Sequence, residues 1–222
     1  MRTIDSKTYE YSEWLRAVFA HPVQANPWYW NCDFIEPDAE TCVDYLTRLF
    51  REPQILDEYL DEQVRDGLYF LISNGCSMHS LAIYDEKVPL QKRVEAMLSM
   101  YDLFSKFMNK RCSAHLSHLD QAGANPINSV TYMWWDIIPF IGHPNDRNFQ
   151  KLDEAALEVM ESTLELDSIA CQENALHGLG HWHMHYPGRV EKAVDKFLKK
   201  NKDKLSKELE TYARAAACGC VN

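Results

Sequence analysis

The sequence contains no uncharged apolar run that approaches the roughly 18 residues of a membrane-spanning helix, so we expect no membrane association. Its first residues, MRTIDSKTYEYSEW, are charged and polar and lack the apolar core of a secretory signal. An excess of basic residues is missing too, because the formal net charge is −10. Neutralising phosphates requires a basic surface, so this charge argues against a nucleic-acid binder. It suits a basic protein partner instead.

Several motifs that carry catalysis are also absent. Gly178-Leu179-Gly180 is not followed by the spacing or the Lys-Ser/Thr pair of a phosphate-binding loop. No G-x-S-x-G nucleophile elbow and no HExxH zinc motif occurs. The seven cysteines are an odd number without the spacing of a small disulfide-stabilised domain. From the cysteines we expect mostly buried thiols in a reducing compartment, the cytoplasm. From the absence of the catalytic motifs we expect a binding protein more than an enzyme.

What the chain does contain is apolar residues at helical spacing along most of its length, with no convincing strand. We predict an all-α fold of about ten helices in one domain over residues 1–222. In it, residues 1–37 would supply a first helix and an aromatic loop that cap the stack. The predicted helices span residues 5–20, 38–51, 53–60, 61–75, 89–112, 125–138, 153–164, 167–186, 188–201 and 203–217.

The most regular helical hairpin follows Asp167. Asp167 or Ser168 can cap its first helix, and Pro187 ends it because the residue before a proline is driven out of the α region. Gly178 and Gly180 each cost a helix about 1 kcal/mol relative to alanine. Glycines within a helical pattern indicate that another backbone approaches closely there.

An earlier hairpin repeats this pattern. EQVRDGLYFL, from Glu62, and ENALHGLGHW, from Glu173, share a glutamate, a polar amide and a Gly-Leu pair, and each is followed by a proline and Arg-Val-Glu. The two hairpins resemble HEAT- or armadillo-type repeats. The resemblance implies antiparallel helix pairs stacked in a right-handed or irregular superhelix that binds a partner along an exposed surface. It implies no catalytic residue.

A row of histidines is the strongest candidate for chemistry. On a continuous helix, residues four apart share one face, and here they are Glu173, His177, His181 and His185. His185 lies two residues before Pro187, so we expect the helix to fray before it reaches this histidine. Two imidazoles at this spacing can hold a divalent metal such as zinc. His115 and His118, with Asp120, would complete the ligand shell if their loop folds over the row. Under this hypothesis the protein is a metal-dependent hydrolase. The alternative is that the histidines lie on the surface and in the grooves of a helical repeat and bind no cofactor.

The leading hypothesis is a protein-binding module. Trp28 and Trp30 lie in an irregular segment that either plugs the end of the stack or offers interaction hot spots. Acidic residues at 33–40 and at Asp57, Glu58, Asp61 and Glu62 either begin solvated helices or dock a basic protein. A specific form of this hypothesis is an immunity-type protein that binds and neutralises a basic effector in the cytosol. Cys218 and Cys220 are either a soft-metal or redox pair or incidental thiols in a disordered end.

Overall fold

The fold is described by a computed structural model for residues 9–31, 34 and 36–221, so the predicted helix start at residues 5–8 lies outside the described part. Within this part twelve α-helices and no strand occur, which confirms the all-α fold. None of these helices is long and apolar enough to cross a bilayer. The helices are α1 (Tyr11–Phe19), α2 (Ala39–Arg51), α3 (Asp61–Ile72), α4 (His79–Ala82), α5 (Leu90–Leu103), α6 (Asn109–Arg111), α7 (Pro126–Tyr132), α8 (Trp134–Ile137), α9 (Gln150–Thr163), α10 (Ile169–Trp182), α11 (Pro187–Asn201) and α12 (Lys207–Ala216).

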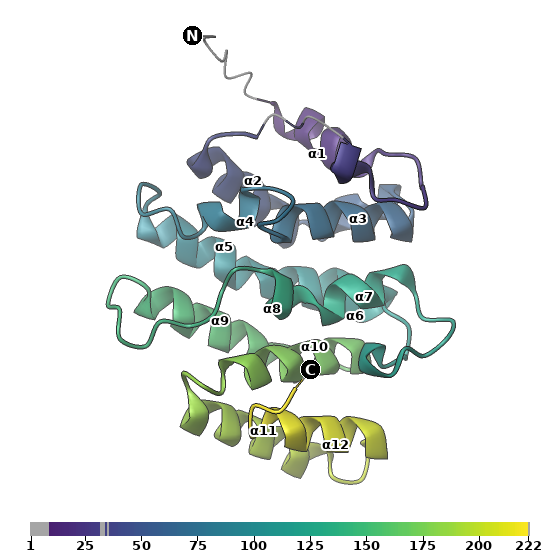
Figure 1. Cartoon of the computed structure of the whole chain (residues 1–222), viewed down its shortest axis with the longest axis vertical. Helices are drawn as coiled ribbons and strands as arrows, with labels where there is room; N and C mark the ends of the chain where they lie inside the picture. Colours follow the sequence, from purple (N-terminus) through teal and green to yellow (C-terminus); the bar gives the residue numbers. More distant parts are fainter. Residues whose placement is uncertain (1–8, 32–33, 35, 222) are drawn as a thin grey trace.

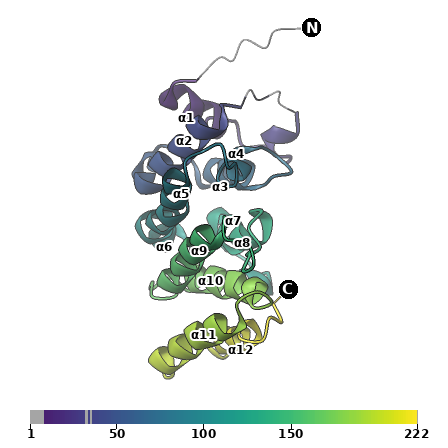
Figure 2. The ribbon, with the colours of Figure 1, turned by 90° about the vertical axis from the view of Figure 1, so that its left-hand side faces the viewer.

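The helices stack in chain order along the long axis of the molecule, from α1 at one end to α11 and α12 at the other (Figure 1). One row of neighbours runs from α2 through α5 to α9, and a second runs from α1 through α3, α7 and α10 to α12. The view turned by 90° shows these rows side by side along the stack (Figure 2). Helix α10 contacts α7, α8, α9, α11 and α12, so it is enclosed on nearly every side.

Local capping chemistry starts several helices where the sequence predicts. The Asp38 carboxylate accepts the backbone N–H of Thr41 at 3.1 Å, which starts α2. The amide oxygen of Asn125 accepts the N–H of Ile127 at 2.8 Å at the start of α7. Ser168 does the same for α10 with the N–H of Cys171, at 3.5 Å. Each cap satisfies a first-turn N–H that has no partner within its own helix.

Other predicted boundaries are wrong. The helix predicted to start at Asp153 starts three residues earlier, at Gln150, and Asp153 lies fully buried in the first turn of α9 and is not its cap. Its carboxylate instead accepts the hydroxyl of Tyr186 at 2.6 Å. Gly75 is not the C-cap of α3, which ends at Ile72 with Ser73 as its cap. Asp153 has a tertiary hydrogen-bond partner, and Gly75 lies in the loop after α3, so neither residue marks a helix boundary.

The helix count exceeds the predicted ten because long periodic stretches are interrupted. The predicted helix 125–138 breaks at Met133 into α7 and α8. The predicted helix 89–112 becomes α5, a π-helical turn over Phe104–Met108, and α6. The segment 76–88, which has no clear periodicity, contains the short α4, and 53–60 is a 3₁₀ helix over Pro53–Glu58. Apolar spacing alone does not reveal such interruptions.

The two Gly-Leu pairs occupy equivalent places. Helices α3 and α10 lie in the same row of the stack, and each glycine receives an aromatic ring from a neighbouring segment. A Cβ on Gly67 would lie 2.3 Å from the Phe19 ring, and a Cβ on Gly178 would lie 2.6 Å from the Trp135 ring. The close approach predicted at Gly178 is therefore made by side chains, not by another backbone.

Replacing Gly178 with alanine is expected to lower the free energy of unfolding by about 1–3 kcal/mol, because the Trp135 ring must shift to admit the methyl group. Gly188, which is in α11 and has open space around its Cα, is the matched control. Gly188→Ala should leave stability unchanged or raise it by up to about 1 kcal/mol through helix propensity. Chemical denaturation of both variants measures the difference, and equal midpoints would contradict the prediction.

The aromatic loop divides between the two functions predicted for it. Trp28 is buried, with its ring stacked on His21 at a centroid distance of 3.8 Å and packed against Phe70 at 4.8 Å. Trp30 is 63% exposed. Trp28 therefore packs against α3 and the segment after α1, whereas the Trp30 side chain lies at the surface, and a role in partner binding stays a prediction. Parts of the predicted capping segment 1–37, namely residues 1–8, 32, 33 and 35, lie outside the described residues.

Candidate metal centre

Three potential metal ligands come together where α8 meets α10. Asp136 of α8 and His177 and His181 of α10 each place one donor atom within 4.8 Å of the other two. The Nε2 atoms of the two histidines are 3.1 Å apart, and Nε2 of His181 is 3.5 Å from Oδ1 of Asp136. Two residues thus come from the predicted i, i+4 pair, and the third comes from a different helix.

These separations fit one small transition-metal ion. Donors bound about 2.0–2.2 Å from a tetrahedral zinc ion lie about 3.3–3.6 Å apart. The observed separation of 3.5 Å falls within that range, the separation of 3.1 Å lies just below it, and the third is at most 4.8 Å. Two imidazoles and one carboxylate are also a donor set that zinc and other divalent first-row metals accept.

His177 is held in position by its second ring nitrogen. Nδ1 lies 2.6 Å from the hydroxyl of Tyr212 in α12, and that hydroxyl is 3.3 Å from the hydroxyl of Tyr132. In the tautomer that would present an unprotonated Nε2 to a metal ion, Nδ1 carries the proton and donates it to the Tyr212 hydroxyl. Such outer contacts fix the tautomer and the ring orientation of metal-binding histidines.

Burial keeps the His177 imidazole neutral. The side chain is only 2% exposed, and burial, with smaller contributions from His181 and His118, lowers the pKa of His177 to about 3. A neutral imidazole is the form that binds metal, so no proton has to leave this residue at neutral pH. Burial also raises the pKa of Tyr212, which keeps its hydroxyl protonated and able to bond both neighbours.

The other two donors face solvent. The side chain of His181 is 36% exposed and that of Asp136 is 41% exposed. An ion can therefore reach the cluster without a rearrangement of the fold. Three protein donors also leave a coordination position for water or a substrate atom, which is the arrangement of open zinc sites.

The structure does not bring the predicted loop histidines into this cluster. His118 donates from Nδ1 to Oε1 of Glu173 at 2.6 Å, and His115 Nδ1 is 2.9 Å from the Ser113 hydroxyl. Asp120, predicted with them, is exposed and adopts a left-handed backbone conformation with φ of 48°. His185 lies beyond the end of α10, so the helical row ends at His181.

Glu173 has a structural role in the row. Its carboxylate is 0% exposed and accepts the backbone N–H groups of Ser117 at 2.8 Å and His118 at 3.0 Å. The N–H of Ser117 binds Oε2, and the N–H and the ring Nδ1 of His118 both bind Oε1, so both carboxylate oxygens accept hydrogen bonds. Glu173 therefore anchors the loop between α6 and α7 to α10, and it is not part of the three-donor cluster.

Asp136 is the site residue that sequence reasoning missed. It is the only charged residue in the apolar stretch VTYMWWDIIPFI, residues 130–141. A lone carboxylate between large apolar residues stands out in the sequence, and the structure places its side chain 41% exposed at the surface. Nothing in the local spacing connects it with the histidines of α10, since the contact between α8 and α10 is tertiary.

The predicted acidic docking residues are partly engaged within the chain. Asp61 accepts both the guanidinium of Arg111, at 2.5 Å from Nη2, and the side-chain amide of Asn125, at 2.6 Å. Asp57 lies 3.5 Å from the same guanidinium. Glu58 is exposed and Glu62 half-buried, and within the described residues neither has an ion-pair partner. Only part of this acidic group is therefore free for a basic partner.

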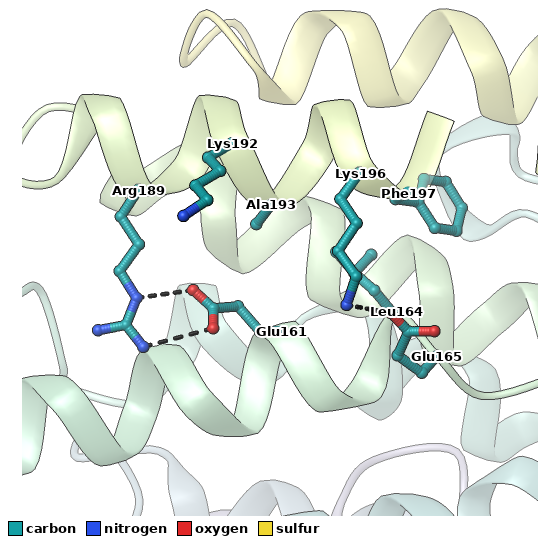
Figure 3. Close-up of a pocket in the computed structure, with 8 residues that line it drawn as sticks. All are labelled: Glu161, Leu164, Glu165, Arg189, Lys192, Ala193, Lys196 and Phe197. Atoms are coloured by element: carbon teal, nitrogen blue, oxygen red, sulfur yellow. Dashed lines mark hydrogen bonds and ion pairs between the residues drawn. The ribbon is translucent and has the colours of Figure 1, made fainter. Parts of the chain in front are cut away.

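A separate groove of about 400 Å³ lies between α9 and α11 (Figure 3). Two ion pairs cross it, from Arg189 Nε to Glu161 Oε1 at 2.6 Å and from Lys196 Nζ to Glu165 Oε1 at 2.9 Å. The buried Phe197 contributes to its apolar lining. These ion pairs link α11 to the C-terminal part of α9 and the turn after it, and the three-donor cluster lies elsewhere, at Asp136, His177 and His181.

Comparison with known proteins adds no relative. No family model, no curated protein and no solved structure matches this chain. The likeness to HEAT and armadillo repeats therefore stays a prediction that rests on the paired hairpins.

Proposed function

We propose that this protein binds one divalent transition-metal ion, with zinc the best fit, through Asp136, His177 and His181. The observation that carries the proposal is the convergence of three donor atoms within 4.8 Å from two helices. The 2.6 Å contact between Nδ1 of His177 and the Tyr212 hydroxyl supports it, because it holds the ring in place while Nε2 lies 3.1 Å from Nε2 of His181. A zinc ion bound there would activate a coordinated water for hydrolysis.

The hydrolase form of this proposal has less support than metal binding itself. Hydrolytic zinc sites pair the ion with a general base, commonly a carboxylate. Glu173, the only other acidic residue on the histidine row, has both oxygens engaged by the loop that contains Ser117 and His118. Binding without an assigned reaction is therefore the function that the geometry supports best.

Titration calorimetry and elemental analysis of protein prepared without an affinity tag test the proposal. We expect one zinc ion per chain in the wild type and no stoichiometric binding in His181→Ala or Asp136→Asn. These two side chains are largely exposed, so both variants should fold. His183→Gln is the matched control, since it removes an imidazole two residues away from His181 and outside the cluster.

Cobalt substitution separates this site from the cysteines. A cobalt ion held by nitrogen and oxygen donors gives ligand-field bands without the intense charge-transfer band of a thiolate ligand. Wild-type protein with alkylated thiols should retain the full cobalt spectrum. Stoichiometric metal that disappears on alkylation, or that survives both His181→Ala and Asp136→Asn, would overturn the proposal.

Partner binding is the second candidate function. It is favoured by the 63% exposure of Trp30, since large exposed aromatic side chains are enriched at interaction hot spots. The net charge of −10 favours a basic protein, in the cytosolic neutralising role predicted above. Trp30→Ala should weaken capture of such a partner, and rising salt should weaken it further; binding that is indifferent to both would exclude this function.

A further inference from the structure

The segment after α12 forms a defined turn that carries two thiols. Gly219 has a φ of 70°, the backbone N–H of Cys220 donates to the carbonyl of Ala215 at 2.9 Å, and that of Gly219 donates to Ala216 at 3.1 Å. These two bonds and the left-handed glycine are the Schellman motif, which ends a helix. Cys218 and Cys220 therefore flank a fixed glycine, contrary to the expectation of disorder.

The turn is also anchored to α10. The side chain of Val221 is buried against Gly180, where an added Cβ would lie 2.5 Å from a Val221 methyl carbon. A Cβ on Gly219 would lie 3.1 Å from Nδ1 of His183. Contacts on both sides of Cys220 thus hold the turn in place while leaving the two cysteines at the surface.

The two thiols differ from the other cysteines of the described chain. Cys218 and Cys220 are exposed, Cys42 and Cys171 are buried, and Cys76 and Cys112 are half-buried. Burial raises the pKa of Cys42 and of Cys112 to about 12, so these thiols are unreactive near neutral pH. Only the pair in the turn combines exposure with a neighbouring thiol.

The separation of the pair suits a disulfide. Two residues with one residue between them lie at most about 7 Å apart along an extended backbone, and a turn brings them closer. A disulfide joins Cα atoms about 4.4–6.8 Å apart. The Cys220 thiol lies 3.6 Å from the carbonyl oxygen of Cys218, so both side chains belong to the same turn.

We propose that Cys218 and Cys220 form a redox-active dithiol, which a low-molecular-weight disulfide such as oxidised glutathione converts reversibly to an intrachain disulfide. The Cys218 thiolate attacks one sulfur of oxidised glutathione and expels the first glutathione thiolate. The Cys220 thiolate then attacks the Cys218 sulfur and expels the second. Two protons and two electrons leave the protein, and one oxidised glutathione becomes two reduced molecules.

The order of attack follows from the local chemistry. The neighbouring Cys218 raises the pKa of Cys220 and so lowers its thiolate fraction near neutral pH, which disfavours Cys220 as the first nucleophile. A disulfide in so small and exposed a ring belongs to the labile class that exchanges with cellular thiols. This inference is independent of metal binding at Asp136, His177 and His181.

Peptide mapping tests the dithiol directly. The full chain is incubated with oxidised glutathione, remaining thiols are alkylated, and trypsin cleaves after Arg214. The peptide that begins at Ala215 contains only two cysteines, Cys218 and Cys220. In the wild type it should lose the mass of two hydrogen atoms, take up no alkylating agent, and recover both thiols with excess reduced glutathione.

Single variants separate disulfide closure from simple modification. In Cys218→Ser and Cys220→Ser the same peptide should carry one glutathione on the remaining cysteine, since no second thiol can displace it. A wild-type peptide that stays doubly alkylated, or that accumulates a stable glutathione adduct, would overturn the proposal. The buried Cys171 should remain fully alkylatable after denaturation in every sample.

Discussion

Glu173→Ala is expected to lower the free energy of unfolding by about 3–5 kcal/mol, because it leaves two backbone N–H groups and the His118 ring without their acceptor. The carboxylate is 0% exposed and accepts the backbone N–H groups of Ser117 and His118 as well as the His118 ring. In a domain of this size, each kcal/mol shifts the melting temperature by about 2–4 °C. The midpoint should therefore fall by roughly 6–20 °C.

Glu165→Ala is the matched control for this change. The Glu165 side chain is 35% exposed and pairs with Lys196 and Lys200 at the surface. Exposed ion pairs contribute about 0–1 kcal/mol, so the control should lose little stability. Hydrogen exchange adds a local measurement: the amides of Ser117 and His118 should lose protection in Glu173→Ala and keep it in Glu165→Ala. Equal melting temperatures for the two variants would contradict the role assigned to Glu173.

Acid is expected to destabilise the protein through His79. Its side chain is 0% exposed, its Nε2 accepts the indole N–H of Trp14 at 2.9 Å, and its Nδ1 is 3.0 Å from the Ser77 hydroxyl. Burial lowers the pKa of His79 from 6.5 to about 3. The folded protein therefore keeps this imidazole neutral at pH values where the unfolded chain binds a proton.

The sign of the effect follows from this difference in proton binding. Above the unfolded pKa of 6.5 neither state is charged, and stability is fully present. As the pH falls toward the folded pKa, the unfolded state gains the proton, and stability is lost at about 1.4 kcal/mol per pH unit. By pH about 4.5, His79 alone should have cost about 2–3 kcal/mol.

Urea denaturation of wild type and His79→Gln at a series of pH values checks this prediction. Glutamine offers Trp14 an acceptor but does not titrate, so the variant should lose less stability on acidification. The stability gap between the two proteins should shrink by about 2–3 kcal/mol from neutral pH to about 4.5. Parallel curves over this range would assign the acid sensitivity to other groups.

Much of the fold could be predicted from sequence because helix signals are local. Apolar spacing gave the helical class, and Asp38, Asn125 and Ser168 marked helix starts through hydrogen bonds to backbone groups only a few residues away. The paired Gly-Leu motif located two helices, α3 and α10, that occupy the same row of the stack. Predictions failed where a residue had a tertiary partner instead, as Asp153 has in Tyr186.

The sequence by itself determined that α10 exists and that His177 and His181 share one of its faces, since four residues make about one helical turn. Only the tertiary structure decided which residues join them. Asp136 reaches the pair because α8 packs on α10, and Tyr212 orients His177 because α12 packs on the same helix. The periodicity of a helix relates residues within one turn of each other, whereas contacts between helices depend on how whole surfaces pack, which no short segment encodes.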